Sequence, residues 1–170
     1  MIQRLFILMI TFLREIPDPV KIKNFKDINV IGIIINLEQP NIAGLSELIK
    51  NFEQLGKKVH TIGIDSTDQR ISQESDIQTI ITKKDLSVFA NPHSEEIKEL
   101  LTKGFEYIII LDTSNNYLVN YFAVKCNANC YIGYFYRPEN KILTMQIAPR
   151  FGLEHIDFVH YIQLIGENNE

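Results

Sequence analysis

The stretch that decides the fold is residues 105–116, which read FEYIIILDTSNN. Residues 107–111 are an unbroken apolar run, and an acid, Asp112, follows them directly. Continuous runs of this kind, without polar alternation, are typical of strands covered on both faces, as in parallel sheets. Thr113 and Ser114 are residue types that cap helices, so we expect a helix to start at one of them. The stretch therefore predicts a buried parallel strand whose carboxyl end leads into a helix.

Similar patterns lie on both sides of this stretch. Residues 29–36 form a second apolar run, a helix with apolar residues at spacings of three and four follows, and residues 60–65 predict the next strand. A strand, helix and strand in this order form a right-handed crossover, so the two strands should be parallel. Further strands are predicted at residues 77–82, 130–136 and 141–147 (the last at an edge), and further helices at 92–103, 113–125 and 153–165. The predicted fold class is α/β, a Rossmann-like three-layer sandwich with a mostly parallel sheet of five or six strands.

The composition suits one globular domain. Of the 170 residues, 45% are hydrophobic and 22% are charged. We expect a single α/β domain in residues 23–170, after an apolar segment and linker in residues 1–22. The net charge of -4 argues against general nucleic-acid binding, which needs a basic surface. Cys126 and Cys130 lie in apolar stretches without a third cysteine or a histidine at ligand spacing, which predicts buried free thiols in a reducing compartment.

The N-terminal segment from Met1 to Leu13 is nearly all apolar, with Arg4 inside it. A membrane-spanning helix needs about 20 residues, so the segment is too short to cross a bilayer. No small-residue cleavage pattern follows, and Pro17 and Pro19 interrupt any helix. We expect a helix that docks on the domain, on a membrane surface or on a partner, and a cytoplasmic location.

Motifs of several familiar sites are absent from the sequence. No G-x-G-x-x-G follows the first strand, where Asn36-Leu37-Glu38-Gln39-Pro40 stands, and dinucleotide binding needs those glycines for close backbone approach. No P-loop, H-E-x-x-H, G-x-S-x-G or C-x-x-C occurs, and the four histidines are scattered. The sequence therefore predicts no catalytic residue, no cofactor and no metal, and it leaves open whether the chain is an enzyme.

The strand ends supply the candidate ligand-binding residues. In open parallel sheets, ligands bind outside the carboxyl ends of the strands, where helix N-termini point free N–H groups. This rule selects Asn36, Asp65, Lys83, Asp112, Ser114 and Asn115. An acid beside hydroxyl and amide groups could hold a sugar hydroxyl, an amine or a metal-bound water. The alternative is structural, with Asp112 accepting hydrogen bonds from the following helix and Lys83 forming a solvated pair with Lys84.

A family resemblance is carried by several segments together. They are residues 29–36, Leu55-Gly56-Lys57-Lys58-Val59, Lys83-Lys84-Asp85-Leu86, Phe105-Glu106-Tyr107, Leu111-Asp112-Thr113-Ser114 and the region from Ala123 to Ile132-Gly133-Tyr134. In these segments, which span about residues 24–165, the chain resembles an uncharacterised Bacteroidota family of short α/β proteins, a domain of unknown function. Members of that family usually begin with a basic helical segment, whereas this chain begins with an apolar one.

A more distant resemblance concerns the N-terminal half of two-domain, heptosyltransferase-type glycosyltransferases. It is carried by a strand that ends in an acid before a helix and by Ile132-Gly133-Tyr134 in a later strand. In that family the sugar nucleotide binds mainly through the second domain, for which this chain has no room.

These features predict a non-catalytic accessory or interaction protein with a protein partner. The alternative is a small ligand-binding protein or enzyme that acts on a nucleotide or sugar at the carboxyl ends of the strands. A third hypothesis gives the segment from Met1 to Leu13 a docking role toward a membrane or another chain.

Overall fold

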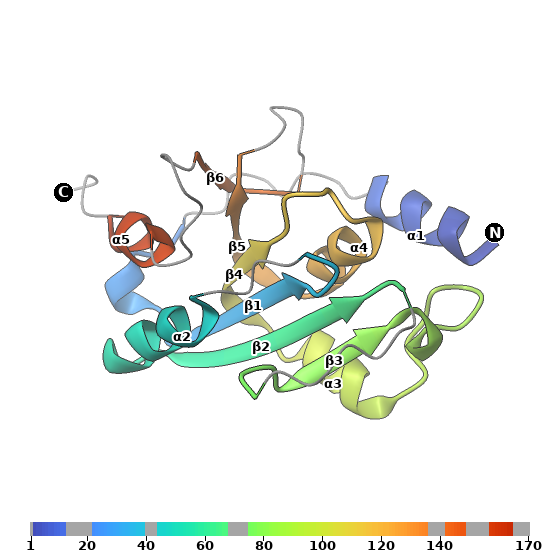
Figure 1. The fold of residues 1–170 in the computed structure, drawn as a ribbon, viewed down its shortest axis with the longest axis horizontal. Coiled ribbons are helices and arrows are strands. Elements are labelled where there is room, and N and C mark those ends of the chain that lie inside the picture. Colours follow the sequence, from blue (N-terminus) through green and yellow to red (C-terminus); the bar gives the residue numbers. More distant parts are fainter. Residues whose placement is uncertain are drawn as a thin grey trace.

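Parallel strands form one sheet in the computed structural model, which describes residues 2–12, 22–39, 44–67, 75–135, 142–148 and 157–164 (Figure 1). The strands are β1 (Val30–Asn36), β2 (Lys58–Asp65), β3 (Thr79–Thr82), β4 (Phe105–Leu111), β5 (Ala128–Tyr134) and β6 (Met145–Ile147). Their spatial order is β3-β2-β1-β4-β5-β6, and each neighbouring pair is parallel. The predicted α/β class and Rossmann-like arrangement are confirmed.

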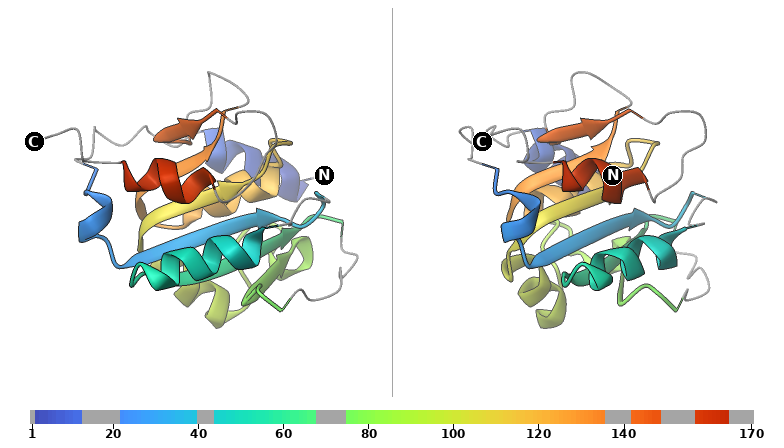
Figure 2. Two further views of the ribbon diagram at one scale, coloured as in Figure 1. Left: turned by 60° about the vertical axis from the view of Figure 1, so that its left-hand side comes forward. Right: turned by 90° about the vertical axis from the view of Figure 1, so that its left-hand side faces the viewer.

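Helices cover both faces of the sheet (Figure 2). One face carries α2 (Leu45–Gln54), α5 (Asp157–Gln163) and the short 3-10 helix η1 (Phe25–Asp27). The other face carries α1 (Ile2–Phe12), α3 (Glu95–Thr102) and α4 (Tyr117–Lys125), and the 3-10 helix η2 (Lys83–Asp85) follows β3. Each face has its own apolar cluster, which explains why the strand sequences are apolar at every position.

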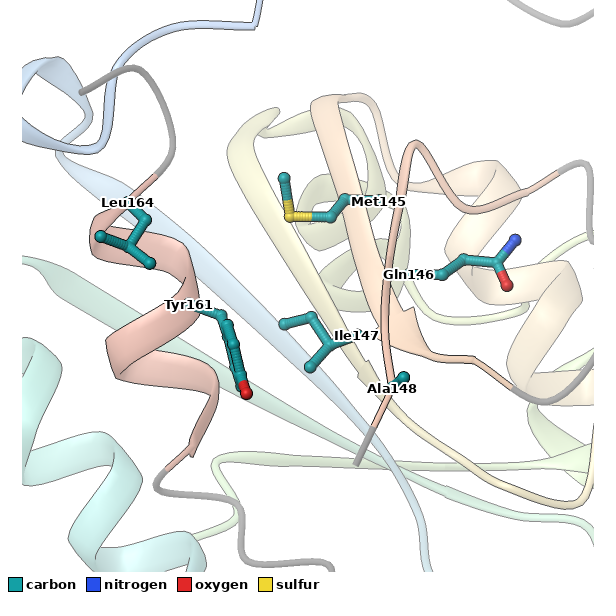
Figure 3. Close-up of a pocket in the computed structure, with 6 residues that line it drawn as sticks. All are labelled: Met145, Gln146, Ile147, Ala148, Tyr161 and Leu164. Atoms are coloured by element: carbon teal, nitrogen blue, oxygen red, sulfur yellow. The ribbon is translucent and has the colours of Figure 1, made fainter. Parts of the chain in front are cut away.

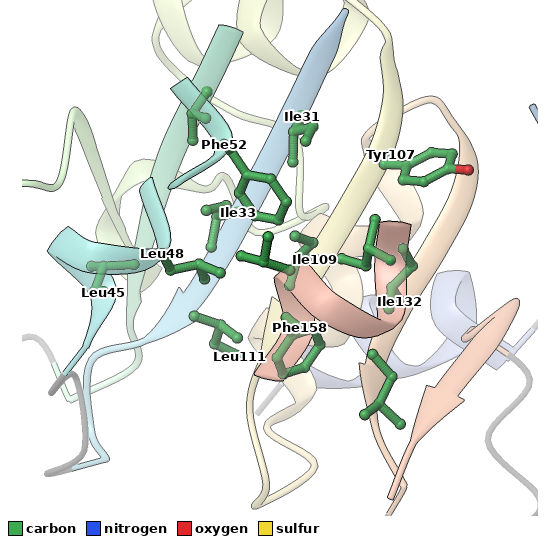
Figure 4. Close-up of a cluster of buried hydrophobic side chains, with 14 of the residues drawn as sticks. Ile31, Ile33, Leu45, Leu48, Phe52, Tyr107, Ile109, Leu111, Ile132 and Phe158 are labelled. Carbon is green, nitrogen blue, oxygen red and sulfur yellow. The ribbon is translucent and has the colours of Figure 1, made fainter. Parts of the chain in front are cut away.

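The first apolar cluster lies between the sheet and the pair α2 and α5 (Figure 4). Ile33, Ile109 and Ile132 project from three neighbouring strands toward Phe52 of α2 and Phe158 of α5. Side chains alternate between the two faces of a strand, so the intervening residues of β1 and β4 fill the second cluster. The sheet is thereby a buried middle layer.

Gly56 follows the last turn of α2. Its φ is +76°, a left-handed conformation that costs glycine little, and its N–H donates to the Glu53 carbonyl at 2.9 Å. The next N–H, from Lys57, reaches back to the Phe52 carbonyl at 3.0 Å. The chain can then turn directly into β2.

Two helix starts differ from the prediction. α3 begins at Glu95 rather than at Pro92, because the Ser94 side chain accepts a hydrogen bond from the Ile97 N–H at 3.3 Å while Pro92 pairs with Leu86 in an isolated bridge. α4 begins at Tyr117, several residues after the expected Thr113 or Ser114. Residues 153–156 and 165 of the expected last helix, residue 136 of the expected strand 130–136 and residue 141 of the expected edge strand lie outside the described residues.

Helix α1 lies against α4 (Figure 1), so the N-terminal segment docks on the domain, one of the three expected positions. Ile7 is fully buried in the second apolar cluster. The Gln3 side chain donates from Nε2 to the carbonyls of Lys83 at 3.3 Å, Leu86 at 2.8 Å and Ser87 at 3.0 Å. Within the described part of the chain, no helix has the length and apolar character needed to cross a membrane.

Both cysteines are free and buried, as predicted. Cys126 belongs to the second apolar cluster, and Cys130 belongs to the first, on the opposite face of the sheet. Burial raises the pKa of each thiol to about 12, so neither is a thiolate near neutral pH. These residues fill core space and do not form a reactive pair.

Candidate functional site

The carboxyl ends of β1 and β4 define the place where a ligand would bind in a sheet of this order. These two strands are neighbours, and the helices that follow them, α2 and α4, cover opposite faces. The chain therefore diverges to both sides between β1 and β4, which makes this point the topological switch of the sheet. Ligands of open α/β sheets bind in the crevice outside such a point.

Three predicted site residues meet at the switch point. Asn36 ends β1 and donates from Nδ2 to Asp112 Oδ1 at 2.8 Å and to Ser114 Oγ at 3.0 Å. The Ser114 hydroxyl donates to the same Asp112 oxygen at 2.7 Å. Asn36 and Asp112 are almost fully buried, whereas Ser114 is exposed. The structure thus brings Asn36 to two side chains that lie 76 and 78 positions later in the sequence.

Asp112 also organises the loop that follows β4. Its Oδ1 accepts the Ser114 N–H at 3.0 Å, and its Oδ2 accepts the Asn116 N–H at 2.7 Å. Asn116 then caps α4, with Oδ1 accepting the Leu118 N–H at 2.9 Å. The structural alternative for Asp112 is therefore well supported, since its carboxylate is hydrogen-bonded to the loop that precedes the helix. The helix cap is Asn116, which lies two positions after Ser114, one of the two residues at which a cap was expected.

Glu38, which the sequence reasoning missed, joins three loops. Its Oε1 accepts hydrogen bonds from the Ser66 N–H at 3.0 Å, from the Ser66 hydroxyl and from Asn116 Nδ2 at 3.1 Å. The loops after β1, β2 and β4 are thereby tied together. Its position in the sequence could have indicated it, because Glu38 lies two residues after Asn36, a strand end that was already a candidate.

Asp65 lies at the end of β2 with one oxygen in use. Its Oδ1 accepts from the N–H of Thr67 at 2.8 Å and from the Thr67 hydroxyl at 2.7 Å. Its Oδ2 is buried and has no hydrogen-bond partner among the described residues. Asp65 itself is fully buried, so this oxygen is an unusual feature of the sheet end.

Lys83 lies away from the switch point, whereas Asn115 lies in the switch-point loop and has a role in its turn. Lys83 follows β3, and β2 lies between β3 and β1, so Lys83 is two strands away from the switch point. Its backbone carbonyl accepts a hydrogen bond from Gln3. Asn115 has a φ of +58° and accepts a hydrogen bond from Asn120 at 2.7 Å, which gives it a role in the turn.

A second unusual surface is formed by α1 and the loop after η2. Side chains on the outer side of α1 are strongly exposed, namely Ile2 at 57%, Leu5 at 67%, Leu8 at 46% and Met9 at 46%. Val88 at 57% and Phe89 at 63% lie in the adjoining loop. The ring of Phe89 contacts that of Phe6 in α1 edge to face at 5.4 Å, which joins the two parts. We call these six exposed residues the α1 surface.

A family model matches residues 12–152 of the chain, and its description is a family of unknown function, DUF6913. The chain belongs to the DUF6913 family. No curated protein and no solved structure matches it. The DUF6913 match contains the whole switch point, whereas the α1 surface is contributed mainly by residues that precede the matched range. This match confirms that the chain belongs to a family of unknown function, as the resemblance predicted.

The electrostatics of the DUF6913 switch point are acidic. Glu38, Asp65 and Asp112 surround it, and no lysine or arginine in the described ranges forms an ion pair with them. Phosphate groups need cationic or N–H donors, so this arrangement favours neutral or cationic ligands over nucleotides. Among the residues that the structure describes, no group of three His, Cys, Asp or Glu side chains could hold a metal ion.

A pocket of about 440 Å³ lies at another place, between β6 and α5 (Figure 3). Ile147 and Met145 of β6 face Tyr161 and Leu164, and Gln146 points away from them. β5 separates this edge from β4, so the pocket is remote from the switch point. None of the predicted site residues lines it.

Proposed function

We propose that the chain is a non-catalytic interaction protein that docks on a protein partner through the α1 surface. The observation that carries this proposal is that α1 is apolar on both of its sides. Its inner side is buried through Ile7, and its outer side exposes Ile2, Leu5 and Met9. An apolar side of a helix is normally buried, so the outer side of α1 needs a covering element.

The α1 surface is held in place by polar contacts. Gln3 fixes the helix to three backbone carbonyls, and the Arg4 guanidinium lies 5.1 Å from the centre of the Tyr117 ring in α4. The loop that carries Val88 and Phe89 is closed by hydrogen bonds, including one from the Ser87 N–H to the Asn91 carbonyl at 2.8 Å. A surface that is already ordered loses little conformational entropy when it binds.

Affinity purification of the full chain tests the proposal. The wild type is compared with a double variant, Leu5→Glu with Phe89→Glu, and with a matched control, Leu55→Glu, which changes an exposed leucine on the opposite face. We expect partners recovered with the wild type and with Leu55→Glu to be lost with the double variant. Identical recovery with all three proteins would refute docking through the α1 surface.

A second candidate function is the binding of a small neutral ligand, such as a sugar, at the switch point. It is favoured by the convergence of Asn36, Asp112 and Ser114. It is also favoured by the buried Oδ2 of Asp65, which has no hydrogen-bond partner among the described residues. The acidic surroundings favour a sugar over a nucleotide.

Thermal shift measurements test this second candidate. Neutral sugars, sugar nucleotides and nucleotides are screened against the wild type, Ser114→Ala and the control Lys83→Ala, which lies two strands away. A sugar-dependent rise in Tm that Ser114→Ala lowers and Lys83→Ala preserves would support the site. The candidate fails if no sugar raises the Tm of the wild type.

A further inference from the structure

We infer, resting on the docking function proposed above, that the partner is a second copy of this chain, with α1 packed against α1 of the other copy. The first observation is the spacing of the exposed residues. Ile2, Leu5 and Met9 are separated by three and four positions, which is the spacing of the apolar seam in paired helices. Such a seam fits the grooves of another helix at a small crossing angle, and α1 presents it away from the sheet.

The second observation is that the seam carries no charge. Arg4 is the one charged residue of α1, and its guanidinium lies over the Tyr117 ring. A twofold interface places each surface against an identical copy, so any charge at its centre would meet a like charge. A neutral apolar seam is self-complementary and avoids this repulsion.

The third observation is the size of the α1 surface. The exposed fractions of its six residues correspond to on the order of 600 Å² of apolar side-chain surface on each copy. Complete burial of this surface on two copies would remove at most about 1,200 Å², which reaches the lower end of the range for specific, stable interfaces. Figure 1 shows α1 at the periphery beside α4, and no other described element covers its outer side.

A membrane surface is a less suitable occupant. Helices that lie in a lipid interface combine an apolar face with a polar face rich in lysine and arginine. The side of α1 opposite its exposed seam is buried against the domain through Ile7, and Arg4 is engaged by an aromatic ring. Helix α1 therefore lacks the polar face, rich in lysine and arginine, that such helices turn toward the lipid headgroups.

Sedimentation velocity of the full chain over a wide concentration range tests the inference. We expect the wild type and Leu55→Glu to form a dimer with the same dissociation constant. Leu5→Glu should weaken the dimer by at least about a hundredfold, since a carboxylate in the seam would face apolar and like-charged neighbours. Leu5→Lys should do the same, whereas an equimolar mixture of Leu5→Glu and Leu5→Lys should recover a dimer. Circular dichroism verifies that each variant is folded.

The contrary outcomes separate the inference from the function on which it rests. A wild type that stays monomeric at every concentration overturns the second-copy inference, as does a dimer that Leu5→Glu leaves intact. If the wild type is monomeric but binds anionic vesicles or another protein in a manner that Leu5→Glu abolishes, the α1 surface is still a docking surface. If Leu5→Glu changes neither self-association nor any other binding, both proposals fail.

Discussion

The two sides of α1 should respond very differently to the same kind of truncation. Ile7 is fully buried in the second apolar cluster, whereas Leu5, two positions earlier, is 67% exposed. We therefore compare Ile7→Ala with Leu5→Ala. Both variants shorten an aliphatic side chain to the same methyl group within one helix, so the difference between them isolates the effect of burial.

The expected magnitude for Ile7→Ala follows from the atoms removed. Loss of three buried carbon atoms at about 0.8 kcal/mol each costs about 2.4 kcal/mol in transfer free energy, to which a cavity term adds. The better helix propensity of alanine returns about 0.4 kcal/mol. The free energy of unfolding should therefore fall by about 2–4 kcal/mol. Leu5→Ala removes mainly exposed atoms, and its effect should stay within about 0.5 kcal/mol.

Urea unfolding followed by far-UV circular dichroism measures both values, and the chain has no tryptophan to serve as a fluorescent probe. The measurement belongs at a concentration low enough to keep the chain monomeric, so that self-association does not add to the effect of Leu5→Ala. If α1 detaches before the rest of the domain unfolds, Ile7→Ala should show an early loss of helical signal. Equal and small effects of the two substitutions would refute the packing of α1 on the domain.

Three further outcomes follow from the buried groups. Asp112→Ala should lower the free energy of unfolding by about 2–4 kcal/mol in urea denaturation, because Asp112 accepts four hydrogen bonds, whereas the exposed neighbour Thr113→Ala should change it by less than about 0.5 kcal/mol. Cys126 and Cys130, with pKa values of about 12, should react with a thiol reagent at pH 8 only after unfolding, and fast labelling of the native protein would contradict their burial. Burial alone would raise the pKa of the Glu106 carboxyl, but hydrogen bonds from a lysine and two backbone N–H groups outweigh burial and lower this pKa. The stability that Glu106 contributes is therefore present above the usual pKa of 4.5 and is lost as pH falls through the lower pKa of the folded state. Glu106→Gln should be less stable at pH 7 and should flatten the acid limb of a stability–pH curve, and an unchanged curve would contradict this role.

Much of the fold could be predicted from the sequence, because a strand covered on both faces must be apolar at every position. The runs at 29–36 and 105–111 carry this signal, and they correspond to β1 and β4. The strand order could not be predicted. It depends on which side of the sheet each crossover helix takes, and the amphipathic pattern of a helix such as α2 is the same for either side.

The start of α4 shows why helix boundaries were harder to predict. Five consecutive residues, 112–116, are polar, and most of them are good caps. The structure selects Asn116 because the Asp112 carboxylate holds the N–H groups of Ser114 and Asn116, while Asn115 adopts a left-handed conformation. The helix can begin only after this turn, and the competition is decided by tertiary contacts of a buried acid.

The candidate site could be predicted only in part, because it also depends on which strands and loops meet in the folded chain. The strand-end rule selected Asn36 and Asp112, and they meet because β1 and β4 are neighbours. The rule also selected Lys83, which lies apart because β2 separates its strand from β1. Glu38 was missed because a loop residue reveals its partners only once the loops are placed. The apolar N-terminal segment predicted docking, but a helix with apolar residues on both sides does not indicate which side faces the domain.

We infer that a second copy of the chain covers the outer side of α1. Nuclear magnetic resonance of methyl-labelled methionine tests it most directly, because Met9 lies in the α1 surface while Met145 lies in β6 at the far edge of the sheet. As the protein concentration rises, the Met9 methyl signal should shift and that of Met145 should stay constant, and Leu5→Glu should abolish the Met9 shift. A Met9 signal that is independent of concentration, or that moves equally in Leu5→Glu, would contradict the claim.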